Sequence, residues 1–157
     1  MKHNFFQHNK VGVALVPQSV TNTTVNGATI TEPWKLGRQI SFIALGGAFA
    51  ATVDGELKLQ GQRRSDSGWE DLKEVDGTTV LRFTDTLLDD GGALENGAAL
   101  GTLEMKRVDA TTYKALRLVF TEAGNAAALV GAAYVISELL EMDSNATDEL
   151  WDKQRTA

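Results

Sequence analysis

Few side chains in this sequence are placed to carry out acid–base or nucleophilic chemistry. The two histidines, His3 and His8, both lie within the first ten residues, and chain termini hold side chains poorly unless other residues tie them down. The sequence has no cysteine, which excludes disulfides and thiolate sites. It contains neither a Gly-x-Ser-x-Gly elbow nor a phosphate-binding P-loop. Because a nucleophile needs a positioned base, we expect a protein that is not an enzyme.

One acidic cluster has the composition of a calcium site. Asp85, Asp89 and Asp90 precede Gly91, and Ca²⁺ binds clustered carboxylate oxygens. The EF-hand spacing is missing, however, as is a glutamate at the distance needed for bidentate binding. A solvated loop explains these acids better than a metal site does. We therefore expect no metal and no cofactor.

The tryptophans allow two interpretations. Trp34, Trp69 and Trp151 could stack on sugars, as in a carbohydrate-binding module, or could serve as core edges and interface anchors. For Trp34 and Trp69 we favour the second interpretation, and we include Trp151 among the candidate interface residues.

Two adjacent phenylalanines, Phe5 and Phe6, lie in a polar segment ahead of the first apolar run. Burial of such a side chain is worth roughly 1.5–3 kcal/mol, so we expect both rings to be covered. They either fold back on their own domain or dock on a neighbouring subunit, where aromatic anchors are common hot spots. The predicted protein interface thus comprises Phe5, Phe6, Trp34, Trp69 and Trp151.

Charge is distributed unevenly along the chain. Residues 138–157 contain six acidic and two basic side chains, which contributes −4 to the net charge of −6. A nearly neutral body without a basic stripe does not fit a nucleic-acid-binding protein. The longest apolar stretch, residues 126–136, is about half the length that spans a bilayer, and no secretory signal is visible. We therefore expect no nucleic-acid partner and no membrane association.

The elements that would carry these residues are mostly strands, because apolar and polar residues alternate with a period of two. Expected strands cover 11–16, 38–45, 56–62, 69–75, 78–83, 102–108, 113–120 and 128–137. The first strand should end at Pro17, and Asn26-Gly27 favours a type I′ hairpin turn within residues 19–31. Residues 128–137 are apolar on both faces, which is typical of a central strand or one covered by a neighbour. Residues 85–101 are expected to form a long surface loop with one helical turn near Ala93. From about Thr147 the sequence is compatible with a short helix, which Thr147 would cap, or with a flexible tail.

The predicted fold is mainly β, an antiparallel β-sandwich or jelly-roll-like barrel. With 157 residues, the chain suits one domain with tails. We expect an N-terminal arm over residues 1–10, a β-sandwich domain over residues 11–138 and an acidic C-terminal tail over residues 139–157.

Several of these segments resemble small virion proteins of tailed bacteriophages. The similar segments are Glu56–Gln62, Ser67–Leu72 with its Gly-Trp-x-Asp-Leu pattern, Tyr113–Phe120 and the Gly/Ala-rich stretch Ala123–Ile136. That group includes capsid decoration (cement) proteins. The resemblance implies attachment to the outer surface of the major capsid protein lattice, often as homotrimers at local threefold positions. It also implies synthesis in the host cytoplasm and a final location on the capsid surface.

Other functions compatible with the sequence are a tail or head–tail connector component and a carbohydrate-binding module. Copy number per particle separates decoration from a connector or tail ring, because hundreds of copies indicate decoration and six or twelve indicate a ring. Glycan binding that depends on Trp69 would indicate the carbohydrate-binding module.

Overall fold

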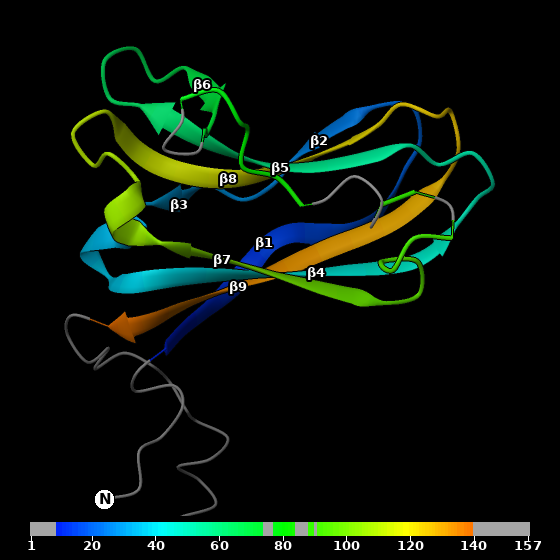
Figure 1. The fold of residues 1–157 in the computed structure, drawn as a ribbon, viewed down its shortest axis with the longest axis horizontal. Coiled ribbons are helices and arrows are strands. Elements are labelled where there is room, and N and C mark those ends of the chain that lie inside the picture. Colours follow the sequence, from blue (N-terminus) through cyan, green and yellow to red (C-terminus); the bar gives the residue numbers. More distant parts are fainter. Residues whose placement is uncertain (1–8, 74–76, 84–87, 90, 140–157) are drawn as a thin grey trace, which may run out of the picture.

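The computed structural model describes residues 9–73, 77–83, 88–89 and 91–139. Two antiparallel sheets lie face to face (Figure 1), which confirms the predicted β-sandwich. The strands are β1 Asn9–Val20, β2 Thr24–Asn26, β3 Ile30–Thr31, β4 Gly37–Phe49, β5 Gly55–Arg63, β6 Trp69–Asp71, β7 Ala98–Glu104, β8 Tyr113–Glu122 and β9 Ala128–Leu139; η1 Pro33–Lys35 and η3 Met105–Arg107 are short 3-10 helices.

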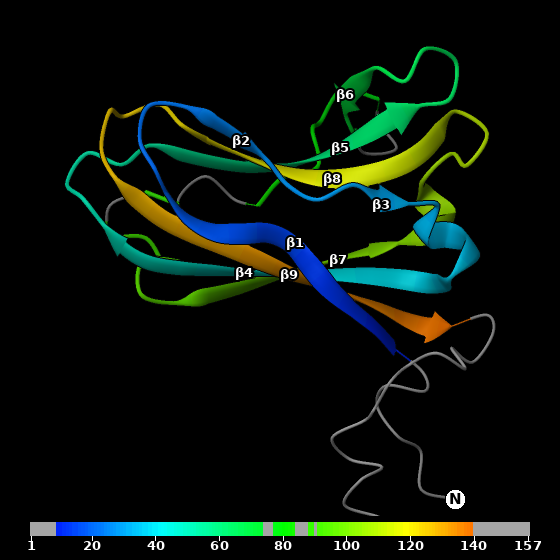
Figure 2. The same cartoon turned by 180° about the vertical axis from the view of Figure 1, so that it is seen from behind.

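The strand order is that of a jelly roll. One sheet has the order β1-β9-β4-β7 and the other β2-β8-β5-β6, with β3 also paired to β8. Since β2 and β3 pair with successive stretches of β8, they are two halves of one interrupted strand. Each sheet then has four strands, and the chain crosses between the sheets repeatedly, as in a double-sheet jelly roll. Figure 2 shows β1 at the edge of the first sheet, beside β9.

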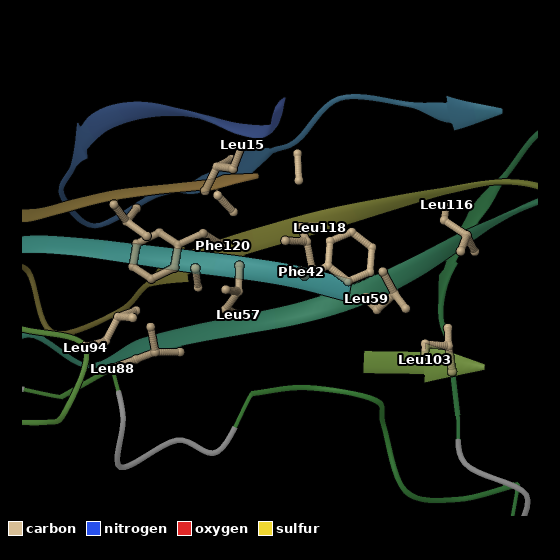
Figure 3. Packing of buried hydrophobic residues seen from close by; sticks show 14 of the residues in the cluster. Leu15, Phe42, Leu57, Leu59, Leu88, Leu94, Leu103, Leu116, Leu118 and Phe120 are labelled. Carbon is tan, nitrogen blue, oxygen red and sulfur yellow. The ribbon is translucent and has the colours of Figure 1, made fainter. Parts of the chain in front are cut away.

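The core fills the space between the sheets. Leucine and phenylalanine side chains from both sheets meet there (Figure 3), among them Leu15, Phe42, Leu57, Leu118 and Phe120, each at most 3% exposed. In β5, Leu57 and Leu59 are buried, whereas the polar residues on either side of them are partly exposed. The alternation that identified this strand therefore reflects one buried and one outward face.

Two expectations about the first strand and its connection are wrong. β1 continues through Pro17 to Val20, because the ladder with β9 is irregular between Leu15 and Gln18 and β1 is an edge strand. A proline at an edge irregularity does not interrupt pairing.

Asn26-Gly27 also does not form a hairpin turn, since neither residue has a positive φ. The Gly27 amide instead donates to Leu118, and the Ala28 amide donates to Ala14, so backbone bonds link β8 to β1 at this point. A Cβ on Gly27 would lie 2.2 Å from the Ala14 carbonyl oxygen. Glycine is thus required for close approach of the backbones, not for a left-handed turn.

The segment predicted as a surface loop is partly built into the core. Leu88 and Leu94 are both fully buried, and residues 91–97 form hydrogen-bonded turns where we expected a helical turn. β7 then begins at Ala98 and ends at Glu104, earlier than the predicted strand 102–108, because Ala98–Glu104 pairs with β4 while Met105–Arg107 forms η3.

Strand ends differ elsewhere as well. β6 covers only Trp69–Asp71, and bridges at Lys73–Val80 and Lys58–Arg82 follow it. At the chain ends, β1 begins at Asn9 and β9 ends at Leu139, next to the predicted arm and tail. The predicted helix near Thr147 lies outside the described residues.

Candidate interaction surface

The outward face of the β1-β9-β4-β7 sheet carries the exposed apolar side chains of the described part of the molecule. The large hydrophobic residues that are exposed there range from 46% (Leu129) to 68% (Leu100), and all lie on these four strands. They are Val11, Val13 and Val16 on β1, Leu129 on β9, Leu45 on β4 and Leu100 on β7. We call this surface the outer apolar face.

The strand register places these residues in rows across the sheet. Val13 pairs with Ala133, which pairs with Ile43, which pairs with Leu100. A neighbouring row runs from Val11 through Val135 and Ser41 to Thr102, where the two hydroxyls share a hydrogen bond of 2.9 Å. On the other side of the Val13 row, Gly131 pairs with Leu45 and Leu45 with Ala98. These three rows contain no charged side chain.

The outward face of the other sheet is polar and closed by its own interactions. Lys58 binds Asp71 at 2.9 Å, and Gln60 donates to Asp71 at 2.7 Å while accepting from Arg117. Burial acts to raise the pKa of Asp71, but the hydrogen bonds from Gln60 and Lys58 outweigh burial and hold the pKa below its ordinary value. One outward face of the sandwich is therefore apolar, and the other is polar and charged.

The structure separates the tryptophans predicted at an interface. Trp69 lies on β6, half-buried, and the Arg117 guanidinium carbon sits 4.1 Å from its ring centroid. Trp34 lies in η1, where it packs against the core and lines a groove of about 590 Å³ with Arg38, Gln39 and Lys106. Phe5, Phe6 and Trp151 lie outside the described residues.

A second cavity runs beside β7. It has a volume of about 250 Å³ and opens between β7 and the segment that follows β6. Its apolar lining includes Leu59, Leu81, Phe83, Leu100 and Leu103. Since Leu103 points into the sandwich and Leu100 points out, β7 has apolar surface on both of its faces.

The one buried acidic side chain of the described residues has a structural role. Glu122, 1% exposed, accepts hydrogen bonds from the backbone amides of Asn22 (2.5 Å), Ala126 (3.3 Å) and Asp54 (3.5 Å). Burial acts to raise the pKa of this carboxyl, but the backbone amides outweigh burial and hold the pKa below its ordinary value of 4.5. Glu122 thus ties three connections together at one end of the sandwich.

The acids considered for calcium are not assembled into a site by the described residues. Asp89 is described and half-buried, whereas Asp85 and Asp90 lie outside the described residues. Within the described ranges, no group of three or more His, Cys, Asp or Glu side chains is arranged to hold a metal ion. No helix in those ranges is long and apolar enough to cross a membrane.

Comparison with known proteins identifies no family. No protein-family model matches the chain, and no curated protein matches it. Among solved structures, Desmodium yellow mottle tymovirus aligns with a TM-score of 0.40 and 8% identity over 87% of this chain and 90% of that chain. The VP2 subviral particle of infectious bursal disease virus aligns with a TM-score of 0.37 and 11% identity over 85% of this chain. This chain covers only 30% of the VP2 chain, and both similarities are too low to bear on function.

The outer apolar face was missed as a site by reasoning from sequence, although one signal for it was present. Residues 128–137 are apolar on both faces, which predicted a central or covered strand, and β9 does lie between β1 and β4. The outward members of that strand, such as Leu129 and Ala133, belong to the outer apolar face. Assigning Leu45 and Leu100 to the same face requires the pairing of β4 with β7 and β9.

Proposed function

We propose that this chain is a bacteriophage capsid decoration (cement) protein without catalytic activity. It binds the outer surface of the major capsid protein lattice through its outer apolar face and stabilises the head. It is made in the host cytoplasm and ends on the surface of the virion. The sequence resemblance to phage virion proteins supplies the partner, and the outer apolar face supplies the means of attachment.

The observation that carries this proposal is an uncharged apolar surface on one sheet only. The largest apolar patch on a typical monomeric soluble protein covers roughly 300–600 Å², and such a patch is often functional. From standard strand spacing, four strands over six residues cover roughly 19 Å by 20 Å. Such a surface is best explained as one that another protein covers.

The size of the face fits attachment to a repeating lattice. An area of roughly 400 Å² from strand spacing is below the ~800 Å² that each partner buries in a standard stable interface. A single contact of this kind is therefore weak. Oligomers that engage several equivalent lattice sites multiply weak contacts, and we propose a homotrimer for this reason and from the resemblance.

The alternatives are less well supported. The Arg117 guanidinium carbon lies 4.1 Å from the centroid of the Trp69 ring and covers one face of it, which leaves a single face for stacking on a sugar. A connector or tail ring uses the same physical features as decoration and is distinguished by copy number. Quantitative mass spectrometry of purified particles would give hundreds of copies for decoration and six or twelve for a ring.

A charge placed on the outer apolar face tests the proposal. We expect Leu45→Lys to fold normally, since Leu45 is 48% exposed, but to lower capsid occupancy at least tenfold because a lysine would be desolvated at the contact. Purified protein is added to capsids prepared without it, and bound copies are counted by mass spectrometry.

The matched control is Thr24→Lys, which adds the same charge on β2 in the other sheet, at an exposed residue. We expect Thr24→Lys to leave occupancy at the level of the unmodified protein. If capsids bind as many copies of the Leu45→Lys protein as of the unmodified protein, the proposal is refuted.

A further inference from the structure

The two edges of the apolar sheet differ in how they are protected. Natural edge strands are usually guarded against pairing with other chains by prolines, bulges or lysines. The β1 edge carries Pro17, two irregularities in its ladder and Lys10. β7 lies at the opposite edge (Figure 1), and within the described residues it pairs only with β4, in a ladder without irregularity. Its sequence, Ala-Ala-Leu-Gly-Thr-Leu-Glu, contains no proline or lysine, and its only charged residue is the last one, Glu104.

Both faces of this unprotected edge are apolar. On the outer side, Leu100 is 68% exposed. On the inner side lies the cavity of about 250 Å³, with Phe83, Gly101 and Leu103 in its wall. An added Cβ on Gly101 would lie 3.1 Å from the Phe83 ring, so the centre of β7 carries no side chain where space is short. A strand placed beside β7 would therefore cover apolar surface on both faces of the sheet.

We propose that β7 pairs with β7 of a second copy of this chain, as an antiparallel ladder about a two-fold axis. Directly opposite side chains of such a ladder point to the same face, so outward residues must lie opposite outward residues. The register that meets this condition and pairs all seven residues of β7 sets Gly101 opposite Gly101 of the second copy. The two-fold axis then passes between the two glycines and makes both halves of the contact equivalent.

In this register the side chains of β7 are complementary to those of an identical strand. On the outer side, Leu100 lies opposite Thr102 of the second copy, and on the inner side Leu103 lies opposite Ala99. Each large side chain therefore meets a smaller one, and the two backbones approach at Gly101 without a side chain between them. Cross-strand contacts of this kind stabilise antiparallel sheets, so an identical strand fits this edge.

The charges beyond the two ends of β7 also favour an antiparallel second copy. Lys106 and Arg107 follow the strand, whereas Glu95 precedes it. Glu104 lies 3.1 Å from Lys106 and 3.9 Å from Arg107, so one acid faces two bases and this end keeps a positive charge. An antiparallel pair brings the basic end of one β7 to the acidic end of the other, at both ends of the contact. A parallel pair would place like charges side by side, which is destabilising.

Pairing at β7 would join the outer apolar faces of the two copies. The two four-stranded sheets become one, and the outward residues of both copies stay on the same side of it. The face of one copy, roughly 400 Å² from strand spacing, becomes a surface of roughly 800 Å², the area that each partner buries in a standard stable interface. Two paired copies would therefore hold one partner surface more tightly than a single copy does.

This contact goes beyond the proposed function and does not require a capsid. Each copy has one β7, so the contact closes on two copies and cannot by itself make a trimer. In the proposed homotrimer it would link one copy of a trimer to one copy of the next. The β7 edge would thus connect neighbouring copies, while the outer apolar face would make the attachment.

Single-cysteine variants test the register in the full-length chain, which has no native cysteine. Without capsids, a Leu100→Cys chain mixed with a longer, tagged Thr102→Cys chain should give a disulfide-linked species of mixed mass on non-reducing gels. The reason is that directly opposite Cβ atoms lie about 4.5–5.5 Å apart. Either variant alone should link far less, since equivalent residues are then diagonal neighbours, about 7–8 Å apart. The control mixes Leu100→Cys with Val13→Cys, which is exposed on the same face but lies on β1, and these should not link.

Substitutions of opposite charge at one exposed position test the same contact by affinity. Ala98 is exposed and, in the proposed register, lies opposite Glu104 of the second copy. We expect Ala98→Glu to raise the dissociation constant of the pair at least about fivefold, because it sets like charges directly opposite each other twice across the axis. Ala98→Lys sets opposite charges there and should leave the dissociation constant unchanged or lower it. Sedimentation equilibrium measures both variants.

Three results would overturn the inference. They are the absence of the mixed-mass species, linking of one variant alone or of the Val13→Cys control as strong as that of the mixture, and equal effects of Ala98→Glu and Ala98→Lys. Capsid occupancy of Leu45→Lys is measured separately, so failure of the β7 contact and failure of capsid attachment remain distinguishable.

Discussion

Glu122 is a buried carboxylate whose hydrogen bonds give it a structural role. A buried acid in a cleft is a standard candidate for catalysis. Here three backbone amides, from Asn22, Ala126 and Asp54, satisfy the carboxylate, and each comes from a different connection of the sandwich. These amides stabilise the carboxylate charge of Glu122, so this side chain links three connections of the sandwich.

We predict that Glu122→Gln lowers the free energy of unfolding by about 1.5–3 kcal/mol, the range for hydrogen bonds to charged groups. Because the folded pKa lies below the ordinary value of 4.5, the native contribution of Glu122 is complete above pH 4.5 and is lost as pH falls through the folded pKa. When the free energy of unfolding is measured with urea between pH 3 and 7, it should fall less toward acidic pH in the variant than in the unmodified protein.

Glu56→Gln is the matched control, because Glu56 is partly exposed and forms a surface pair with Arg82 at 3.4 Å. We expect it to change stability by no more than about 0.5 kcal/mol, as surface substitutions usually do. An equal effect of the two substitutions would contradict the role given to Glu122.

At the scale of elements, the connection that leads into β7 is anchored by two leucines. Leu88 and Leu94 are fully buried, and the Gly46 amide of β4 donates to Gly97 at 3.0 Å. A Cβ on Gly46 would lie 2.0 Å from the Leu94 carbonyl oxygen, so the turn packs directly on β4. This packing fixes where β7 begins, and with it the position of Leu100.

We predict that Leu94→Ala costs about 2–5 kcal/mol, the range for a buried leucine that leaves a cavity. Ala93→Ser, at the exposed neighbouring position, should cost less than about 0.5 kcal/mol. Chemical denaturation monitored by tryptophan fluorescence measures both. A change for Leu94→Ala as small as that for Ala93→Ser would mean that the turn is not part of the core.

The sequence predicts strands well where one face is buried, and poorly where long-range pairing decides the outcome. Leu57 and Leu59 alternate with polar residues, which is enough to identify β5. Asn26-Gly27 has the local chemistry of a hairpin turn, but β8 and β1 take its backbone hydrogen bonds. The outer apolar face could not be predicted because its residues come from four strands whose neighbours are distant in sequence.

At the scale of the whole molecule, the two outward faces of the sandwich differ in chemistry: one is charged and the other apolar. The sheet containing β5 and β8 is covered by internally paired charges, such as Lys58 with Asp71. The sheet containing β4 and β9 presents Val13, Leu45 and Leu129 without a charge among its central rows. This asymmetry is the physical basis of the proposed attachment.

Hydroxyl-radical footprinting of the free and the capsid-bound protein measures the coverage of each face directly. We predict that oxidation of Val13, Leu45 and Leu129 falls strongly on binding, while oxidation of Trp69, on β6 of the other sheet, stays as it is in the free protein. Protection of Trp69 with Val13, Leu45 and Leu129 still oxidised would contradict the claim that the outer apolar face binds the partner.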